Sequence, residues 1–216
     1  MKRVLFQGDS ITDCGRNRND FYGMGNGYPY LAKGEIELEF GEEYEVLNRG
    51  VSGNRITDLI ARIKCDILNL NPDYMSILIG INDIWHDLGG WPNGVDTEDF
   101  EFYYDHLLTV LKTKIPHTKI AIMEPYVFEN EATRNTEGIP DKWERFKKGA
   151  EERAAVAKKL AEKHGLAFIP LQEELNKAVE RIGVNKVTAD GVHPAVAGHI
   201  VIKNQWMKWF KEAIKE

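Results

Sequence analysis

The sequence predicts an α/β protein with three layers, in which a five-stranded, mostly parallel sheet lies between two layers of helices. Two observations lead to this prediction. Five short apolar, β-branched runs recur along the chain, and segments with the period of an amphipathic helix lie between them. Strands that alternate with helices form βαβ units and a parallel sheet, and five such strands favour a flavodoxin-like, doubly wound layout.

The apolar runs predict strands at 4–6, 44–47, 74–79, 119–123 and 166–169. Apolar residues spaced at i, i+3, i+4 and i+7 predict amphipathic helices over 56–67, 100–111, 143–160 and 202–213. The third helix is expected to end at Lys163-His164-Gly165, because cations in the last turn and a glycine just past it are a common stop. Pro194 is expected to open the last helix at its first position.

Three long loops follow the first, third and fourth predicted strands, over 13–28, 85–96 and 126–141. All three therefore leave the sheet at its carboxyl edge. Open α/β sheets bind their ligands at this edge, and long loops there are more often functional than decorative.

The length and the charge of the chain limit the possible functions. Its 216 residues are expected to form a single domain, 1–216. Its net charge of −6, with no Lys/Arg block, argues against nucleic acid and against an anionic membrane surface as partners. The apolar run at the N-terminus is too short for a secretory signal, and no run is long enough to cross a bilayer, so we expect a cytoplasmic protein. Cys14 and Cys65 lack metal-ligand spacing and are expected to be free thiols.

Candidate functional residues stand where the first three predicted strands end. Ser10, in Gly8-Asp9-Ser10, is either an exposed nucleophile near helix N–H groups or a helix N-cap. Gly53 can leave its backbone N–H pointing at a ligand, or it can serve only as a turn. Asn82 can donate a side-chain N–H to an anion, or it can cap a helix.

A candidate base stands near the C-terminus. Asp190 and His193 lie three residues apart on a loop, so the carboxylate can bond to Nδ1 and leave Nε2 free. This is the base half of a serine triad, and its loop can fold back over the edge that carries Ser10. Each signal is weak alone, but their joint occurrence in this order is specific.

Together these blocks resemble those of the SGNH (GDSL-type) hydrolase family. Gly8-Asp9-Ser10 matches the first block of the family, and Gly53 matches the second. Gly80-x-Asn82-Asp83 matches the third block, and Asp190-x-x-His193 matches the fifth. The resemblance extends from residue 8 to residue 194.

The resemblance implies a role for each matching residue. Ser10 is the nucleophile, His193 is its general base, and Asp190 orients His193. The oxyanion hole consists of the backbone N–H groups of Ser10 and Gly53 and the side-chain amide of Asn82. The physical requirements agree, because a serine hydroxyl needs an adjacent base and a tetrahedral oxyanion needs preset donors. We expect no cofactor and no metal.

Residues 8–14 and 79–85 look most like the intracellular acetylxylan-esterase branch of this family. This resemblance implies a serine esterase that deacetylates short xylo-oligosaccharides through an acyl-enzyme intermediate, and it implies a homo-oligomer. Flat aromatic rings suit the faces of sugars, and several lie in or beside the long loops. We therefore predict substrate contacts at the rings of Tyr22, Trp85 and Trp91. We also predict one at Asp9, which is next to Ser10 in the chain. For any single ring, packing of the loop onto the body is an equal alternative.

Three other functions stay open at this stage. A lipid or thioester hydrolase of the same fold differs only in the acyl group that it prefers. A metal-dependent phosphoesterase would use ligands from the set Asp9, Asp13, Asn82, Asp83 and His193. Its usual G-D-x-x-D pattern fails, however, because residue 12 is threonine. A non-catalytic module that binds phosphate or sugar at helix N-termini would not need His193.

Overall fold

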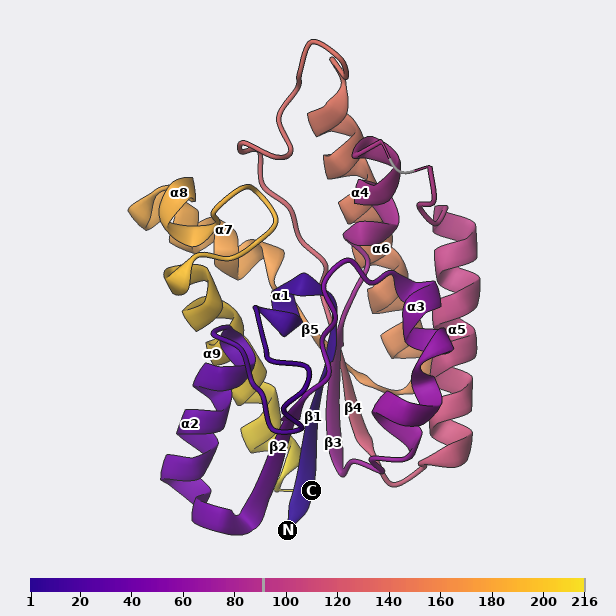
Figure 1. Cartoon of the computed structure of the whole chain (residues 1–216), viewed down its shortest axis with the longest axis vertical. Helices are drawn as coiled ribbons and strands as arrows, with labels where there is room; N and C mark the ends of the chain where they lie inside the picture. Colours follow the sequence, from indigo (N-terminus) through magenta and orange to yellow (C-terminus); the bar gives the residue numbers. More distant parts are fainter. Residues whose placement is uncertain (91, 216) are drawn as a thin grey trace.

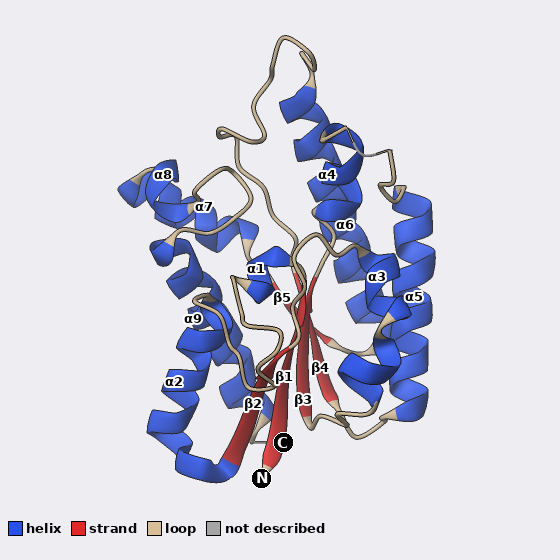
Figure 2. Ribbon diagram, in the orientation of Figure 1, coloured by secondary structure: helices blue, strands red, loops and turns tan. Residues whose placement is uncertain are grey.

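The structure is a computed structural model that describes residues 1–90 and 92–215. These residues contain one five-stranded sheet, with all strands parallel and in the order β2-β1-β3-β4-β5 (Figure 2). The strands are β1 (Lys2–Gly8), β2 (Tyr44–Asn48), β3 (Tyr74–Leu78), β4 (Lys119–Met123) and β5 (Ala167–Ile169). The predicted α/β fold and its flavodoxin-like strand order are therefore confirmed.

Helices cover both faces of the sheet. They are α1 (Ser10–Asp13), α2 (Tyr28–Phe40), α3 (Ile56–Ala61), α4 (Asn82–Leu88), α5 (Thr97–Lys114), α6 (Lys142–His164), α7 (Gln172–Ile182), α8 (Val184–Val187) and α9 (Val196–Ala213), with a 3₁₀ turn η1 (Gly41–Glu43) and a π-helical segment η2 (Lys64–Leu68). The four predicted helices correspond to α3 with η2, α5, α6 and α9. Among the described residues, no helix combines the length and the apolar character needed to span a membrane.

Side chains of each strand alternate between two cores. Val4 and Phe6 of β1 pack in one core and Leu5 in the other. Figure 1 shows α2 and α9 on one side of the sheet and α3, α5 and α6 on the other. A sheet that is buried on both faces needs apolar residues at nearly every position, which explains the continuous apolar runs in the sequence.

Two local predictions are wrong. The segment 85–96 is not a loop throughout, because α4 includes its first four residues and places His86 in a helix. Ile84 and Leu88 anchor this short helix in the core at i, i+4 spacing, which is too little for a periodic signal. Pro194 does not open α9, which begins at Val196. Instead, Pro194 forms an antiparallel bridge with Thr188.

Candidate active site

Ser10 lies where the chain turns out of β1 into α1. Asp9 caps this short helix, since its Oδ1 accepts the Ile11 N–H at 3.0 Å. The turn places Ser10 at the carboxyl edge of the sheet, next to the switch point between β1 and β3, where the strand order reverses. Cys14 ends the helix in a left-handed conformation, with φ of 41°.

The structure brings Ser10, His193 and Asp190 together, although 183 residues separate Ser10 from His193. The Ser10 Oγ lies 2.9 Å from the His193 Nε2, and the His193 Nδ1 lies 2.7 Å from the Asp190 Oδ2. A carboxylate only accepts hydrogen bonds, so Nδ1 carries the proton and Nε2 is left to accept from the Ser10 hydroxyl. This is the arrangement of a nucleophile, a base and a group that orients the base.

The loop that carries Asp190 and His193 is fixed by its own hydrogen bonds. The bridge from Thr188 to Pro194 closes the loop, and the Asp190 Oδ1 accepts the N–H groups of Val192 and His193 at 2.9 and 2.8 Å. The carboxylate is thus positioned before it meets the imidazole. Its orientation does not depend on the Ser10 side chain.

Charge stabilises this pair. The Asp190 carboxylate raises the pKa of His193 above its ordinary value, mainly through their hydrogen bond and against the opposing effect of burial. Burial acts to raise the pKa of Asp190, but hydrogen bonds from the side chain and backbone of His193 outweigh it, and the pKa is lowered. Asp190 is therefore ionised at neutral pH, as an orienting carboxylate must be.

Gly53 lies on the loop after β2, which is bound on two sides. On one side, the Asp13 Oδ2 accepts the backbone N–H of Ser52 at 2.9 Å and its hydroxyl at 3.1 Å. Gly53 has a φ of 82°, a conformation that favours glycine. Its N–H meets no backbone acceptor in the described part of the chain, so this donor is available to a ligand.

On the other side, the start of α4 binds the same loop. The Asn82 Nδ2 donates to the Asn54 carbonyl at 3.1 Å, and the Asp83 Oδ1 accepts the Ile56 N–H at 3.1 Å. The amide nitrogen of Asn82 has two hydrogens, so one remains for an anion. Two adjacent residues of α4 thereby fix the position of the Gly53 loop relative to the Asn82 amide.

Comparison with known proteins identifies the family of this chain. The model of the GDSL-like Lipase/Acylhydrolase family matches residues 6–201. The chain belongs to the GDSL-like lipase/acylhydrolase family. Its acylhydrolase function follows from that membership, and it is a carboxylic ester hydrolase of the SGNH type.

The similarity to known relatives extends over nearly the whole chain. An acetylxylan esterase from Geobacillus stearothermophilus is 31% identical over 219 residues, which cover 96% of this chain and 93% of the relative. The solved structure of a putative GDSL-like lipase from Parabacteroides merdae is 34% identical, with a TM-score of 0.88, and the match covers 96% of this chain and 94% of that one. The solved structure of Axe2, an acetylxylan esterase from G. stearothermophilus, is 30% identical, with a TM-score of 0.82 and coverage of 96% and 93%.

Asp9 and Trp85, two of the predicted substrate contacts, lie beside the triad of this acylhydrolase. The Trp85 ring lies 5.6 Å from the His193 ring, between centroids, and also packs edge-on against Phe146. Asp9 is buried, with 1% of its surface exposed, and its carboxylate caps α1. Burial raises the pKa of Asp9 to about 7. Asp9 thus lies in the protein interior next to Ser10, and it stabilises the short helix that begins at Ser10.

The structure does not bring Tyr22 to the triad. Its hydroxyl donates to Glu45 at 3.3 Å, and Glu45 pairs in register with Arg3, near the amino end of the sheet. Trp91 lies outside the described residues. Tyr28 is the first residue of α2, and Tyr126 lies in the loop after β4. Both are buried and pack onto the body.

Three charged residues hold the site together in a way that was not predicted from the sequence. Arg62 was not singled out at all, and Asp13 and Asp83 were named as possible metal ligands and not as supports of the site. Arg62 donates to the Gly8 carbonyl at 3.1 Å and to the Arg49 carbonyl at 2.7 Å, which joins the ends of β1 and β2. No local pattern marks it. Asp83, in contrast, directly follows Asn82, and its position in the third block was a usable signal.

Asp9, Asp13 and Asp83, the carboxylates of the metal-dependent alternative, have separate tasks. Asp9 caps α1. Asp13 accepts hydrogen bonds from Ser52 and forms an ion pair with Arg18 at 2.6 Å. Asp83 accepts the N–H of Ile56, the first residue of α3. The described residues contain no group of three or more His, Cys, Asp or Glu side chains placed to hold a metal ion.

We expect Asn82→Ala to lower kcat by about 10²–10³-fold, as loss of one oxyanion donor does, while KM changes little. The change also removes the bond to the Asn54 carbonyl, so circular dichroism and thermal unfolding should accompany the kinetics with an aryl acetate. Asn54→Ala is the matched control, because the Asn54 carbonyl remains and its side chain loses only the bond that its Oδ1 accepts from Arg62 at 2.6 Å. A kcat within a few-fold of wild type would remove Asn82 from the oxyanion hole.

Proposed function

We propose that this hydrolase removes acetyl groups from short acetylated xylo-oligosaccharides through an acetyl-enzyme intermediate. The observation that carries the proposal is the continuous hydrogen-bond chain from the Ser10 Oγ to the His193 Nε2 and from Nδ1 to Asp190. Acyl transfer to serine requires a hydroxyl that is hydrogen-bonded to an oriented base.

In the first half of the reaction, the Ser10 Oγ attacks the acetyl carbonyl and the His193 Nε2 takes the hydroxyl proton. The N–H groups of Ser10 and Gly53 and the amide of Asn82 stabilise the oxyanion. The tetrahedral intermediate then expels the sugar hydroxyl, which receives its proton from His193. Asp190 stabilises the imidazolium between these two proton transfers.

In the second half, a water molecule attacks the acetyl group on Ser10. His193 accepts the proton of this water and returns it to the Ser10 oxygen when the acetyl-oxygen bond breaks. Acetate is released and the hydroxyl is restored. The same base therefore acts twice, and no other group is needed for proton transfer.

Three observations support an acetylated saccharide as the substrate. The Geobacillus relative is an acetylxylan esterase, and mutant structures of Axe2 are described as those of an acetyl-xylooligosaccharide esterase. Catalytic mutants of Axe2 replace a serine, an aspartate or a histidine by alanine, the same three residue types that form the triad here. In this chain, the half-buried Trp85 ring beside His193 offers a flat apolar surface to a sugar or to an acetyl group.

The decisive experiment measures acetate release from acetylated xylo-oligosaccharides and compares it with hydrolysis of p-nitrophenyl esters of rising acyl length. We expect rapid acetate release and a fall in kcat/KM beyond the shortest acyl chains. The Ser10→Ala protein supplies the blank. A steep rise in kcat/KM with acyl length would instead identify a lipid or thioester hydrolase of the same fold.

The pH profile should report the ionisation of His193. The base must be neutral, and its hydrogen bond to Asp190 raises its pKa above the ordinary value of 6.5. We therefore expect kcat/KM to fall on the acid side, with a midpoint above pH 6.5. We expect Asp9→Asn to shift this acid limb to lower pH. Asp9 has a pKa of about 7, so it is partly ionised in this range, and the substitution removes that partial charge and lowers the pKa of His193. The asparagine oxygen still accepts the Ile11 N–H. An acid limb at the same pH in Asp9→Asn and wild type would contradict the coupling of these two groups.

A further inference from the structure

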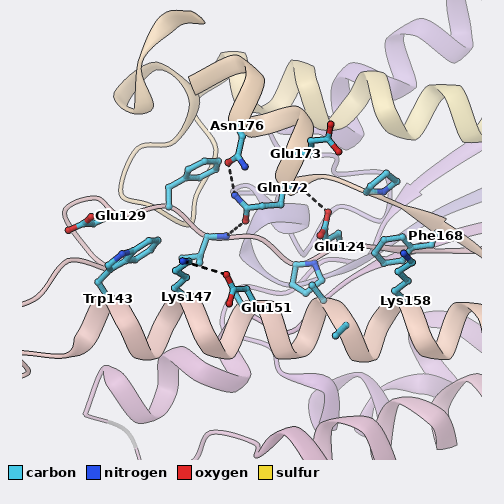
Figure 3. Close-up of a pocket in the computed structure, with 17 residues that line it drawn as sticks. Glu124, Glu129, Trp143, Lys147, Glu151, Lys158, Phe168, Gln172, Glu173 and Asn176 are labelled. Atoms are coloured by element: carbon cyan, nitrogen blue, oxygen red, sulfur yellow. Dashed lines mark hydrogen bonds and ion pairs between the residues drawn. The ribbon is translucent and has the colours of Figure 1, made fainter. Parts of the chain in front are cut away.

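A groove with a volume of about 680 Å³ lies between α6 and α7, beside the edge strand β5. In Figure 3, Trp143, Lys147 and Glu151 rise from one face of α6 toward Gln172 and Asn176 of α7. The face of α6 that lines the groove also carries small residues, Ala150, Ala154 and Ala155, which leave room that larger side chains would fill. The volume is typical of a site for a small organic ligand.

The lining of the groove combines aromatic rings with oriented amides. Trp143, Phe128 and Phe168 supply the rings. The Gln172 side chain is fixed, because its Oε1 accepts the Val127 N–H at 3.0 Å and its Nε2 donates to the Asn176 Oδ1 at 3.0 Å. Flat rings with a few fixed hydrogen-bonding groups suit a neutral polyol better than they suit an ion.

The wall of the groove contacts the loop that carries Asp190 and His193. Phe128, which lines the groove, donates its N–H to the Gly191 carbonyl at 2.8 Å, and Gly191 lies between Asp190 and His193 in the chain. Aromatic packing provides a second connection. The His193 ring contacts Trp85, Trp85 contacts Phe146 at 5.8 Å between centroids, and Trp143 lies one helical turn before Phe146.

We propose that this groove binds the sugar units of the substrate that lie beyond the acetylated unit at Ser10, with Trp143 as the stacking platform. The inference rests on the proposed function and adds to it a binding site for the remainder of the oligosaccharide. An acyl chain fits less well, because the exposed charged residues Glu129, Lys147, Glu151 and Glu173 flank the groove. Hydrocarbon gains its binding free energy from removal from water, which an open groove with charged walls does not provide.

The test compares two substrates in each variant. For each protein we would measure kcat/KM for an acetylated xylotetraose and for p-nitrophenyl acetate, which carries no further sugar units. We expect Trp143→Ala to lower the ratio of the two values by about fivefold to tenfold, the size of effect that a lost ring contact has. The matched control is Phe102→Ala, which removes a ring that is 66% exposed on α5 and should keep the wild-type ratio.

A second variant guards against loss of folding. Ala154→Trp fills the groove from α6 without removing any packed side chain, and it should lower the same ratio by tenfold or more. Binding of unacetylated xylotetraose to the Ser10→Ala protein, measured by calorimetry, should weaken in both groove variants.

The outcomes separate the two proposals. Loss of the p-nitrophenyl acetate and xylotetraose activities in equal proportion, or an unchanged ratio in both variants, would overturn the groove assignment while the proposed function stands. A groove variant that selectively loses hydrolysis of long acyl esters would also overturn it, in favour of an acyl-chain site. Failure of the wild-type protein to release acetate from the xylotetraose, with p-nitrophenyl acetate still hydrolysed, would overturn the proposed function itself.

Discussion

Ser10→Ala is expected to lower kcat by on the order of 10⁶-fold while leaving the fold intact, because it removes the hydroxyl that bonds to the base. The Ser10 Oγ is the only group that the His193 Nε2 meets in the described part of the chain, at 2.9 Å. Among the described residues, the half-buried hydroxyl bonds only to His193, so its loss should change the melting temperature little. Kinetics with p-nitrophenyl acetate and a thermal melt check both parts of the prediction.

A double substitution distinguishes a shared mechanism from two independent defects. Residues that act as one unit are strongly non-additive, so Ser10→Ala combined with His193→Ala should be no slower than either single variant. Ser52→Ala is the control, since it removes another serine hydroxyl at the same edge, while the Ser52 backbone N–H keeps its bond to Asp13 at 2.9 Å and still anchors the loop. We expect that variant to stay within a few-fold of wild type. Multiplication of the two single effects in the double variant would contradict a Ser10–His193 unit.

The sheet and the core of the site were predictable from sequence because both depend on short-range patterns. A parallel strand buried on both faces reads as an apolar run, and each run ends where the chain leaves the carboxyl edge. Ser10, Gly53 and Asn82 follow three such runs directly, so their convergence follows from the topology alone. Asp190 and His193 were found because three residues of spacing allow one loop to pair them.

The parts that could not be predicted depend on partners distant in sequence. In α2 the buried residues Tyr28, Ala32 and Ile36 are spaced by four, but exposed Tyr30 and Leu38 obscure the stripe. Pattern alone therefore gives no clear helical face. The position of α2 against the sheet becomes evident only when α9 lies beside it.

The path of the loop after α1 shows the same limit. The guanidinium of Arg49 lies 4.3 Å from the centre of the Phe21 ring and donates to the Phe21 carbonyl at 3.0 Å. These contacts hold the loop along β2 and carry Tyr22 to Glu45, away from the triad. A composition rich in aromatic residues predicts contact area, but the direction of a loop is set by such tertiary contacts.

Asp190→Asn is expected to lower kcat by about 10⁴-fold, the effect that a triad has when its histidine is held in the wrong tautomer. The backbone N–H groups of Val192 and His193 both point at the Asp190 Oδ1 and require an acceptor there. In the asparagine variant the amide oxygen must therefore face the backbone, and the NH₂ group faces the His193 Nδ1. Nδ1 then has to accept a hydrogen bond, and the imidazole proton moves to Nε2. A protonated Nε2 can no longer accept the proton of the Ser10 hydroxyl.

The same bonds predict that this variant stays folded, because the backbone donors keep their acceptor. Asp190→Ala is the informative comparison, since it leaves the histidine free to adopt either tautomer but loses both the backbone acceptor and the charge. We expect Asp190→Asn to retain a melting temperature near wild type and Asp190→Ala to fall below it. NMR of the imidazole nitrogens in Asp190→Asn should show the proton on Nε2. A proton that stayed on Nδ1, or a kcat within tenfold of wild type, would mean that Asp190 does not control the tautomer of His193.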